Sequence, residues 1–450
     1  MSTHLALALT AHAQGQSPIA WDGNGPVSLD QFLADVTRLA GLFLPGRHVL
    51  NVCQDRYHFM VGLAACLVTG RISLQPPTYT ADMVAHLRRL APDAWALHDT
   101  GGDAIDLPCL RCPEGHAAAQ PAASVPAIDP TQLVAYVFTS GSTGEPVPHR
   151  KTWGALVRNA RAEASRLGVL AHGHAIVGTV PPQHMYGFES TVLLSLHGAC
   201  TCWHGRPFYP ADIVAALSAV PRPRMLVTTP FHLRSLLDAG LDLPAVDLLL
   251  SATAPLSEKL ALTAEERFQS PLLEIYGCTE SGQLASRRTV ATQEWELFQD
   301  VALEREGEQF SVSGGHVEGR VPLSDIVEST SANKFLLLGR SADMVNVAGK
   351  RTSLGHLNFH LNAIPGVDDG SFFLPDGNTA DEVARLCAFA VAPGLTPRDI
   401  VDALRRRIDP IFLPRPLVLL DSLPREATGK LPRASLQALF DQHCGSDRNA

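Results

Sequence analysis

The chain has 450 residues, of which 46% are hydrophobic and 18% are charged, and its formal net charge is −9. A chain of this length can bury more than one core, so at least two domains are expected, and the near-average contents of Gly (35) and Pro (33) exclude collagen-like and disordered proteins. Acidic residues (45) outnumber Lys and Arg (36) and no long basic run occurs, which argues against a nucleic-acid partner.

The N-terminus resembles a signal peptide only in the small residues that flank His12. Residues 1–20 contain no Lys or Arg, and the apolar stretch 5–9 is too short for a signal sequence. No apolar run approaches the ~20 residues that span a bilayer. The nine cysteines are scattered and odd in number, which favours reduced thiols over a disulfide framework. We therefore expect a cytoplasmic protein without a membrane span.

Two short cysteine pairs could be proposed as parts of one zinc site. Neither pair comes with a second pair at a known spacing, so we interpret both as incidental. They are Cys109 and Cys112 near His116, and Cys200 and Cys202 near His204.

Apolar runs alternate with amphipathic stretches along the first two thirds of the chain. Helices are predicted at 30–43, 153–167, 211–219, 231–239 and 257–268, and buried strands at 133–139, 175–180, 225–229, 246–251 and 272–276. This alternation is typical of an α/β fold with mostly parallel sheets.

The chain is expected to form a large and a small domain. An Ala- and Pro-rich stretch, 113–130, is interpreted as a linker between an N-terminal lobe and the first glycine-rich loop. A smaller unit opens with apolar β-type segments from about Phe335 and contains a helix predicted at 397–408. We place the boundary between Leu338 and Gly339, which gives a large domain over 1–338 and a small one over 339–450.

A glycine-rich loop directly follows the strand at 133–139. Its residues are Thr139, Ser140, Gly141, Ser142, Thr143 and Gly144. Two glycines permit a tight turn, so that backbone N–H groups and hydroxyls can converge on one anion, as in phosphate-binding loops. The loop is not a Walker A sequence, because no Lys-Ser or Lys-Thr pair follows the last glycine. An ordinary polar turn remains an equal alternative for this segment alone.

Three later motifs occur in a fixed order after this loop. They are Tyr276-Gly277-Cys278-Thr279-Glu280, Gly339-Arg340-Ser341-Ala342-Asp343, and the segment from Pro424 to Leu431 that contains Lys430. Together with Thr139–Gly144, their order and spacing resemble the adenylate-forming superfamily of acyl-CoA synthetases, peptide-synthetase adenylation domains and luciferases. The segments TSGSTGEPVPHRKTWGAL and PPQHMYGFE are similar to the short aryl-acid ligases of bacterial aryl-polyene and xanthomonadin pigment clusters.

The resemblance implies a large α/β domain, a small mobile α+β domain, and a site for ATP. Hydroxyls of the glycine-rich loop would hold the β- and γ-phosphates, Thr279 the α-phosphate, and Glu280 a magnesium ion. Tyr276 and Gly277 would face one side of adenine and Ser251, Ala252, Thr253 and Ala254 the other, while Asp325 and Arg340 would bind the ribose. Lys430 would contact the acid carboxylate and the α-phosphate. Gly349 and Lys350 would line a channel for pantetheine.

Two positions depart from the family pattern. The lysine usually found after the glycine-rich loop is Val147, for which Lys151 or Arg150 could substitute. The usual charged hinge residue is Ala342, which puts in doubt how the rotation of the small domain is controlled.

The family's acid-binding motif corresponds to His184, Tyr186, Gly187 and Phe188, with Thr229 and Ile275 in the pocket walls. Rings, hydroxyls and small residues suit a flat acid with a polar substituent. For His184 alone, a structural core histidine is an equal alternative. Glu189 could accept a hydrogen bond from a phenol, although a solvated or helix-capping carboxylate is the preferred interpretation.

These residues predict an AMP-forming acid–thiol ligase that uses ATP and Mg²⁺. Its substrate would be an aryl acid, 3- or 4-hydroxybenzoate, and its acceptor the phosphopantetheine thiol of an acyl carrier protein or coenzyme A, for pigment biosynthesis. Alternatives are a ligase for fatty or short-chain acids and a non-catalytic nucleotide-binding regulator.

Overall fold

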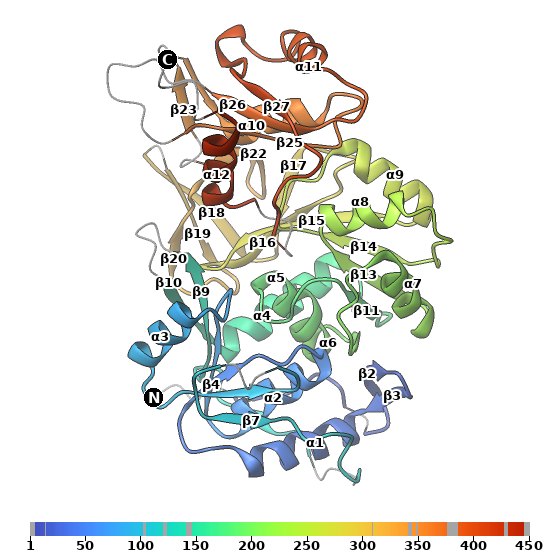
Figure 1. Ribbon diagram of the computed structural model, residues 1–450. Coiled ribbons are helices and arrows are strands. Elements are labelled where there is room, and N and C mark those ends of the chain that lie inside the picture. Colours follow the sequence, from blue (N-terminus) through green and yellow to red (C-terminus); the bar gives the residue numbers. More distant parts are fainter. Residues whose placement is uncertain are drawn as a thin grey trace.

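The computed structural model describes residues 5–13, 15–101, 105–119, 124–140, 146–307, 309–340, 344–347, 350–375, 386–426 and 431–444. Figure 1 shows three tiers, with the N-terminal strands at the bottom, the largest sheet in the middle and the C-terminal elements at the top.

The N-terminal tier is a six-stranded sheet. Its order is β10-β9-β5-β4-β6-β7, with the bounds Pro146–Thr152, Leu133–Ser140, Ile72–Gln75, His48–Asn51, Trp95–His98 and Cys109–Arg111. All of its pairs are parallel except β10 with β9. The helices of this tier are α1 (Leu29–Leu42), α2 (Arg56–Val68) and α3 (Ala81–Leu90), and a short pair joins β1 (Leu7–Ala8) to β8 (Ala127–Ile128).

The middle tier is an eleven-stranded sheet. Its order is β21-β22-β17-β16-β15-β14-β13-β11-β12-β2-β3, with the bounds Asp325–Ser331, Lys334–Arg340, Glu294–Leu297, Gly282–Arg287, Leu272–Cys278, Leu248–Ser251, Arg224–Thr228, Ala175–Gly178, Thr201–Trp203, Pro18–Asp22 and Gly25–Ser28. Strands β2, β12, β11, β13, β14 and β15 run parallel, and the outer pairs are antiparallel. Strands β18 (Val301–Glu306), β19 (Gln309–Gly314) and β20 (Arg320–Pro322) form a separate small sheet.

The helices of the middle tier connect its parallel strands. They are α4 (Trp153–Leu167), α5 (Met185–Gly187), the π-helical turn η2 (Phe188–Leu193), α6 (Leu194–His197), α7 (Pro210–Ala219), α8 (Pro230–Asp238) and α9 (Glu258–Phe268). Several begin where a Ser, Thr or Asp side chain accepts a backbone N–H of the first turn, as Thr152 does for α4 and Thr229 for α8. The predicted α/β class, helices and strands are confirmed here to within a few residues.

The C-terminal elements have their own apolar clusters. They are β23 (Met344–Val347), β24 (Lys350–Ser353), α10 (Leu354–Asn362), β25 (Asp369–Phe373), β26 (Cys387–Val391), α11 (Pro397–Leu404), the 3-10 turn η4 (Pro410–Phe412), β27 (Leu417–Leu419) and α12 (Arg433–Cys444). Both clusters consist of residues from Val345 onward. Helix α11 ends at Leu404 rather than at the predicted 408, and exposed Arg405–Arg407 follow it as a turn. The segment from Phe335, with which the smaller unit was expected to open, lies in β22 of the eleven-stranded sheet, and this strand continues past the predicted boundary to Arg340.

The interpretation of 113–130 as a linker between a separate lobe and the later strands is wrong. Strand β9, which follows this stretch, pairs in parallel with β5, which precedes it. One apolar cluster contains Trp95 from before the stretch and Trp153 from after it. The strands on either side of this stretch therefore belong to one sheet, a long-range pairing that local composition does not reveal.

Arg56 joins the two large sheets. It is fully buried at the start of α2, and its guanidinium donates to Thr191 Oγ1 and to the carbonyls of Trp203, Gly205, Gly178 and Val180. Burial lowers its pKa to about 10, so the side chain stays charged at neutral pH.

We expect Arg56→Leu to lower the free energy of unfolding by about 3–5 kcal/mol, because two buried and two half-buried carbonyls would lose this donor. Urea denaturation followed by circular dichroism measures this loss. Arg88→Leu is the control, because the contact of Arg88 with Asp106 is an exposed ion pair and its loss should change little. Equal losses in the two variants would contradict this role for Arg56.

Candidate active site

The candidate site lies where neighbouring parallel strands end. Thr229 directly follows β13, Ser251 is the last residue of β14, and Tyr276 lies near the end of β15. The register places Thr228 opposite Ser251, and Ser251 opposite Glu274. Ligands of open α/β sheets bind at this edge, so the strand order brings together residues that are far apart in the sequence.

The residues predicted to bind the nucleoside come together. The Tyr276 hydroxyl donates to Asp325 Oδ2 at 2.7 Å, and Asp325 pairs with Arg340 across the antiparallel strands β21 and β22. Gly277 allows a close approach of β15 to β16, because a Cβ there would lie 2.4 Å from the Gly282 carbonyl oxygen.

The opposite wall follows β14. Ser251 and Ala252 are buried, and the Ser251 hydroxyl has no hydrogen-bond partner among the described residues. Thr253 has φ +78, an unusual conformation for a β-branched residue. Ala254 continues this segment. Strained backbone of this kind clusters at binding sites.

Thr139 of the predicted phosphate loop and the predicted magnesium residue Glu280 both contact a histidine that was not among the predicted site residues. His149 Nε2 lies 2.9 Å from Thr139 Oγ1 and 3.6 Å from Glu280 Oε1. Burial lowers the pKa of His149. His149 follows Val147 by two residues along β10, and residues two apart in a strand point to the same face. This spacing from Val147, where the family has its lysine, is the sequence signal that could have identified His149.

Lys151 lies two residues further along β10. Its ammonium donates to the Glu280 carbonyl at 3.2 Å and is buried, which lowers its pKa. Thr279 is half-buried in the turn between β15 and β16. Gly141, Ser142, Thr143 and Gly144 lie outside the described residues, as do the side chains of Ser140 and Arg340.

The predicted acid residues take different roles. Tyr186 is buried and donates its hydroxyl to the Leu250 carbonyl at 3.0 Å, while Ile275 is buried in β15. Gly187 packs against Pro181, whose carbonyl oxygen would lie 2.1 Å from a Cβ. Thr229 caps α8, and its Oγ1 lies 3.0 Å from His232 Nδ1. Phe188 is fully buried in the core against Phe59.

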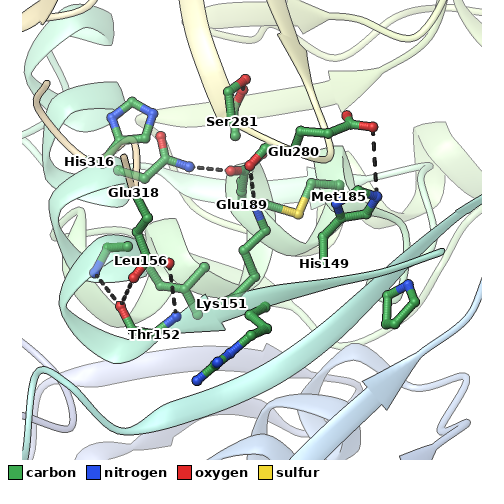
Figure 2. A pocket seen from close by; sticks show the side chains of 15 residues that line it. His149, Lys151, Thr152, Leu156, Met185, Glu189, Glu280, Ser281, His316 and Glu318 are labelled. Carbon is green, nitrogen blue, oxygen red and sulfur yellow. Dashed lines mark hydrogen bonds and ion pairs between the residues drawn. The ribbon is translucent and has the colours of Figure 1, made fainter. Parts of the chain in front are cut away.

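A cavity of about 420 Å³ connects part of the acid motif with the phosphate side. It is lined by Met185, which lies between His184 and Tyr186, and by Glu280 and Ser281. Glu189 and Lys151 also line it (Figure 2). The preferred interpretation of Glu189 as a solvated or capping carboxylate is wrong, because its side chain is 2% exposed inside this cavity and accepts a hydrogen bond from Asn159 Nδ2.

The remaining predicted residues belong to the C-terminal part. Lys350 is exposed on β24, and its ammonium pairs with Asp409. Gly349 and Lys430 lie outside the described residues.

No group of three or more His, Cys, Asp or Glu is arranged to hold a metal ion within the part of the chain that the structure describes. Within the same part, no helix is both long and apolar enough to cross a membrane.

Comparison with known proteins identifies the family. The chain is 31% identical to a 4-coumarate–CoA ligase of Rhodobacter capsulatus over 232 residues, which are 51% of this chain and 58% of that enzyme. A 4-chlorobenzoate–CoA ligase of Arthrobacter is 24% identical over 361 residues, 70% of this chain and 68% of that enzyme. The crystal structure of an anthranilate CoA ligase in complex with anthranoyl-AMP has a TM-score of 0.82 at 14% identity and covers 98% of this chain and 99% of its own.

The match thus spans less than two thirds of the length of the Rhodobacter enzyme. The likeness to the anthranilate CoA ligase structure shows that the two proteins share the adenylate-forming fold. The sequence profile of the AMP-binding enzymes matches residues 9–303, more than half of the chain. This agrees with the motifs at Thr139 and Tyr276, and the protein is a member of the family of AMP-binding enzymes.

Proposed function

We propose that this protein is an ATP-dependent ligase that joins an aryl acid, 3- or 4-hydroxybenzoate, to a phosphopantetheine thiol through an acyl-AMP. The observation that carries this proposal is the convergence of Thr139, His149 and Glu280 at contact distances beside the pair Tyr276 and Asp325. Relatives named as 4-coumarate and 4-chlorobenzoate CoA ligases support an aromatic acid.

The acceptor is the thiol of coenzyme A or of an acyl carrier protein, and the names of the relatives support the former. We assign the enzyme to the biosynthesis of aryl-polyene or xanthomonadin-type pigments, on the resemblance of its glycine-rich loop and His184 motifs. Nine free cysteines suit a reducing cytoplasm.

Formation of an acyl-AMP requires a site that stabilises the negative charge of the ATP phosphates. A carboxylate is a poor electrophile. Its attack on the α-phosphate of ATP displaces pyrophosphate and gives an acyl-AMP, from which AMP leaves readily when a thiol attacks the acyl carbon. Thr139 would donate to the phosphates, and Thr279 to the α-phosphate. Tyr276 would hold the Asp325 carboxylate in position for the ribose hydroxyls. Such preorganised contacts stabilise the charge that develops during phosphoryl transfer.

Magnesium fits the donors present. Glu280 supplies a carboxylate that contacts the same His149 nitrogen as the Thr139 hydroxyl. The described residues contain no group of three or more metal-binding side chains. Phosphate oxygens would therefore supply further ligands of the ion, as is usual for magnesium. When bound, it would neutralise phosphate charge.

We propose that residues 1–338 form the adenylating domain and 339–450 the mobile small domain. The separate apolar clusters from Val345 onward support this division. Lys430 would meet the acyl-AMP during adenylation, and Gly349 and Lys350 would border the pantetheine channel during thiol attack.

Exchange of labelled pyrophosphate into ATP across a panel of acids tests the proposed function. We expect 3- or 4-hydroxybenzoate to support faster exchange than octanoate or longer fatty acids, because the candidate cavity combines apolar Met185 with buried polar side chains. A preference for octanoate would favour a fatty-acid ligase, and nucleotide binding without exchange for any acid would favour a regulator. Either result would contradict the proposal.

A further inference from the structure

The cavity of about 420 Å³ has an apolar side and a buried polar end. Met185, Leu156 and Ala155 supply apolar surface, whereas Glu189, Asn159 and His316 supply buried polar groups. These three come from η2, from α4 and from the segment after β19. The polar end is therefore a product of tertiary packing.

The Glu189 carboxyl accepts hydrogen bonds from Asn159 Nδ2 and from the Gln283 backbone, and in its neutral form it adds a donor at this end. Burial raises the pKa of its carboxyl to about 8, although Lys151 opposes the shift, so the neutral acid predominates at pH 7. A neutral carboxyl carries one O–H and one carbonyl oxygen. Gly282, the first residue of β16, has φ +82 and allows the chain to pass close to Glu189, because a Cβ at this position would lie 2.8 Å from Glu189 Oε1.

The other two side chains each keep a buried polar atom without a partner. Asn159 is 2% exposed, and its Oδ1 has no hydrogen-bond partner among the described residues, although its Nδ2 donates to Glu189. His316 is 4% exposed, and beyond the contact of its ring with the Gln283 backbone at least one ring nitrogen has no hydrogen-bond partner among the described residues. Burial lowers the pKa of His316 to about 4, which the nearby Gln283 backbone only partly opposes, so the ring is neutral. Buried polar atoms normally have partners, so these point to a ligand.

The required ligand group follows from these donors and acceptors. A hydrocarbon tail would leave the Asn159 oxygen and the His316 ring unsatisfied. A hydroxyl or an amino group can donate and accept at once, and it can therefore meet Asn159 Oδ1, the His316 ring and the Glu189 carboxyl. The cavity is also lined by Glu280, the residue proposed to hold magnesium at the phosphates.

We propose that this cavity receives the far end of the acid substrate, and that Glu189, Asn159 and His316 select an acid bearing a hydroxyl or amino group there. The inference rests on the proposed function and deepens it, since it assigns specificity to three residues outside the predicted acid motif.

The test compares kcat/KM for 4-hydroxybenzoate, 4-aminobenzoate, 4-methylbenzoate and benzoate in pyrophosphate exchange. The first two distinguish a hydroxyl from an amino group, and 4-methylbenzoate matches their size without hydrogen bonding. We expect Glu189→Met to reduce the preference for the better polar acid over 4-methylbenzoate by about tenfold or more. Glu189→Gln, which keeps a donor and an acceptor, should retain most of that preference.

Glu163→Met is the matched control. Glu163 is also fully buried and burial raises its pKa to about 8, but its Oε1 accepts from Ser190 and Gln283, and it does not line the cavity. This variant should lose stability and keep the wild-type preference. Calorimetric binding of the acids to each variant gives a second measurement that does not need turnover.

The outcomes separate the two proposals. An unchanged preference in Glu189→Met, or an equal loss in Glu163→Met, would overturn the assignment of the polar end while leaving the ligase function intact. Failure of every acid to support exchange by the wild-type enzyme would instead overturn the proposed function.

Discussion

Replacing Glu280 by Gln is expected to slow acid-dependent pyrophosphate exchange by about 10²–10³-fold. The change keeps the size of the side chain but removes the carboxylate charge that we assign to magnesium beside the phosphates. Loss of one preorganised electrostatic contact in a transition state typically has this effect. The Glu280 carbonyl, which accepts from Lys151, is untouched, so the local fold should persist.

The control for Glu280 is another carboxylate of the same cavity. Glu318 accepts the Thr152 hydroxyl at 2.7 Å and has no role in our assignment of magnesium. Glu318→Gln should therefore exchange pyrophosphate at close to the wild-type rate. Raising the magnesium concentration should partly restore Glu280→Gln if the carboxylate binds the ion. Equal losses in the two variants, without such a restoration, would refute the assignment.

Replacing Lys430 by Ala is expected to abolish pyrophosphate exchange and yet leave the second half-reaction intact. By the family resemblance, the Lys430 ammonium contacts the acid carboxylate and the α-phosphate as a point charge only while the acyl-AMP forms. The loss should reach about 10²–10³-fold in the first step. The second step, thioester formation, is measured separately by supplying acyl-AMP and monitoring its conversion into the thioester by chromatography.

Gly349→Leu should show the opposite pattern. Gly349 is assigned to the pantetheine channel, where a large side chain would obstruct the thiol and spare adenylation. By the family resemblance Ala342 would stand at the hinge, so a changed rotation of the small domain is the competing explanation if the two half-reactions do not separate. If both variants lose the same half-reaction to the same degree, the assignment of these residues to separate steps is wrong.

Much of the fold could be predicted because its signals are local. Apolar runs of strand length and stretches with helical periodicity alternate along the chain, and β13, β14 and β15 lie where these patterns predict them. The residues that follow these strands could also be predicted to meet, because parallel strands present their ends at one edge. The helix predicted at 397–408 was too long because helix ends are poorly encoded in periodicity.

The α/β class and the motifs of the AMP-binding family could be predicted because each depends on residues that are close together in the chain. The packing of distant segments was needed to show that the strands on either side of 113–130 share one sheet, that His149 contacts Thr139 and Glu280, and that Glu189 is buried beside Asn159. Each of these depends on which distant segments pack together. Strand pairing and side-chain burial set those contacts, and no local pattern records them.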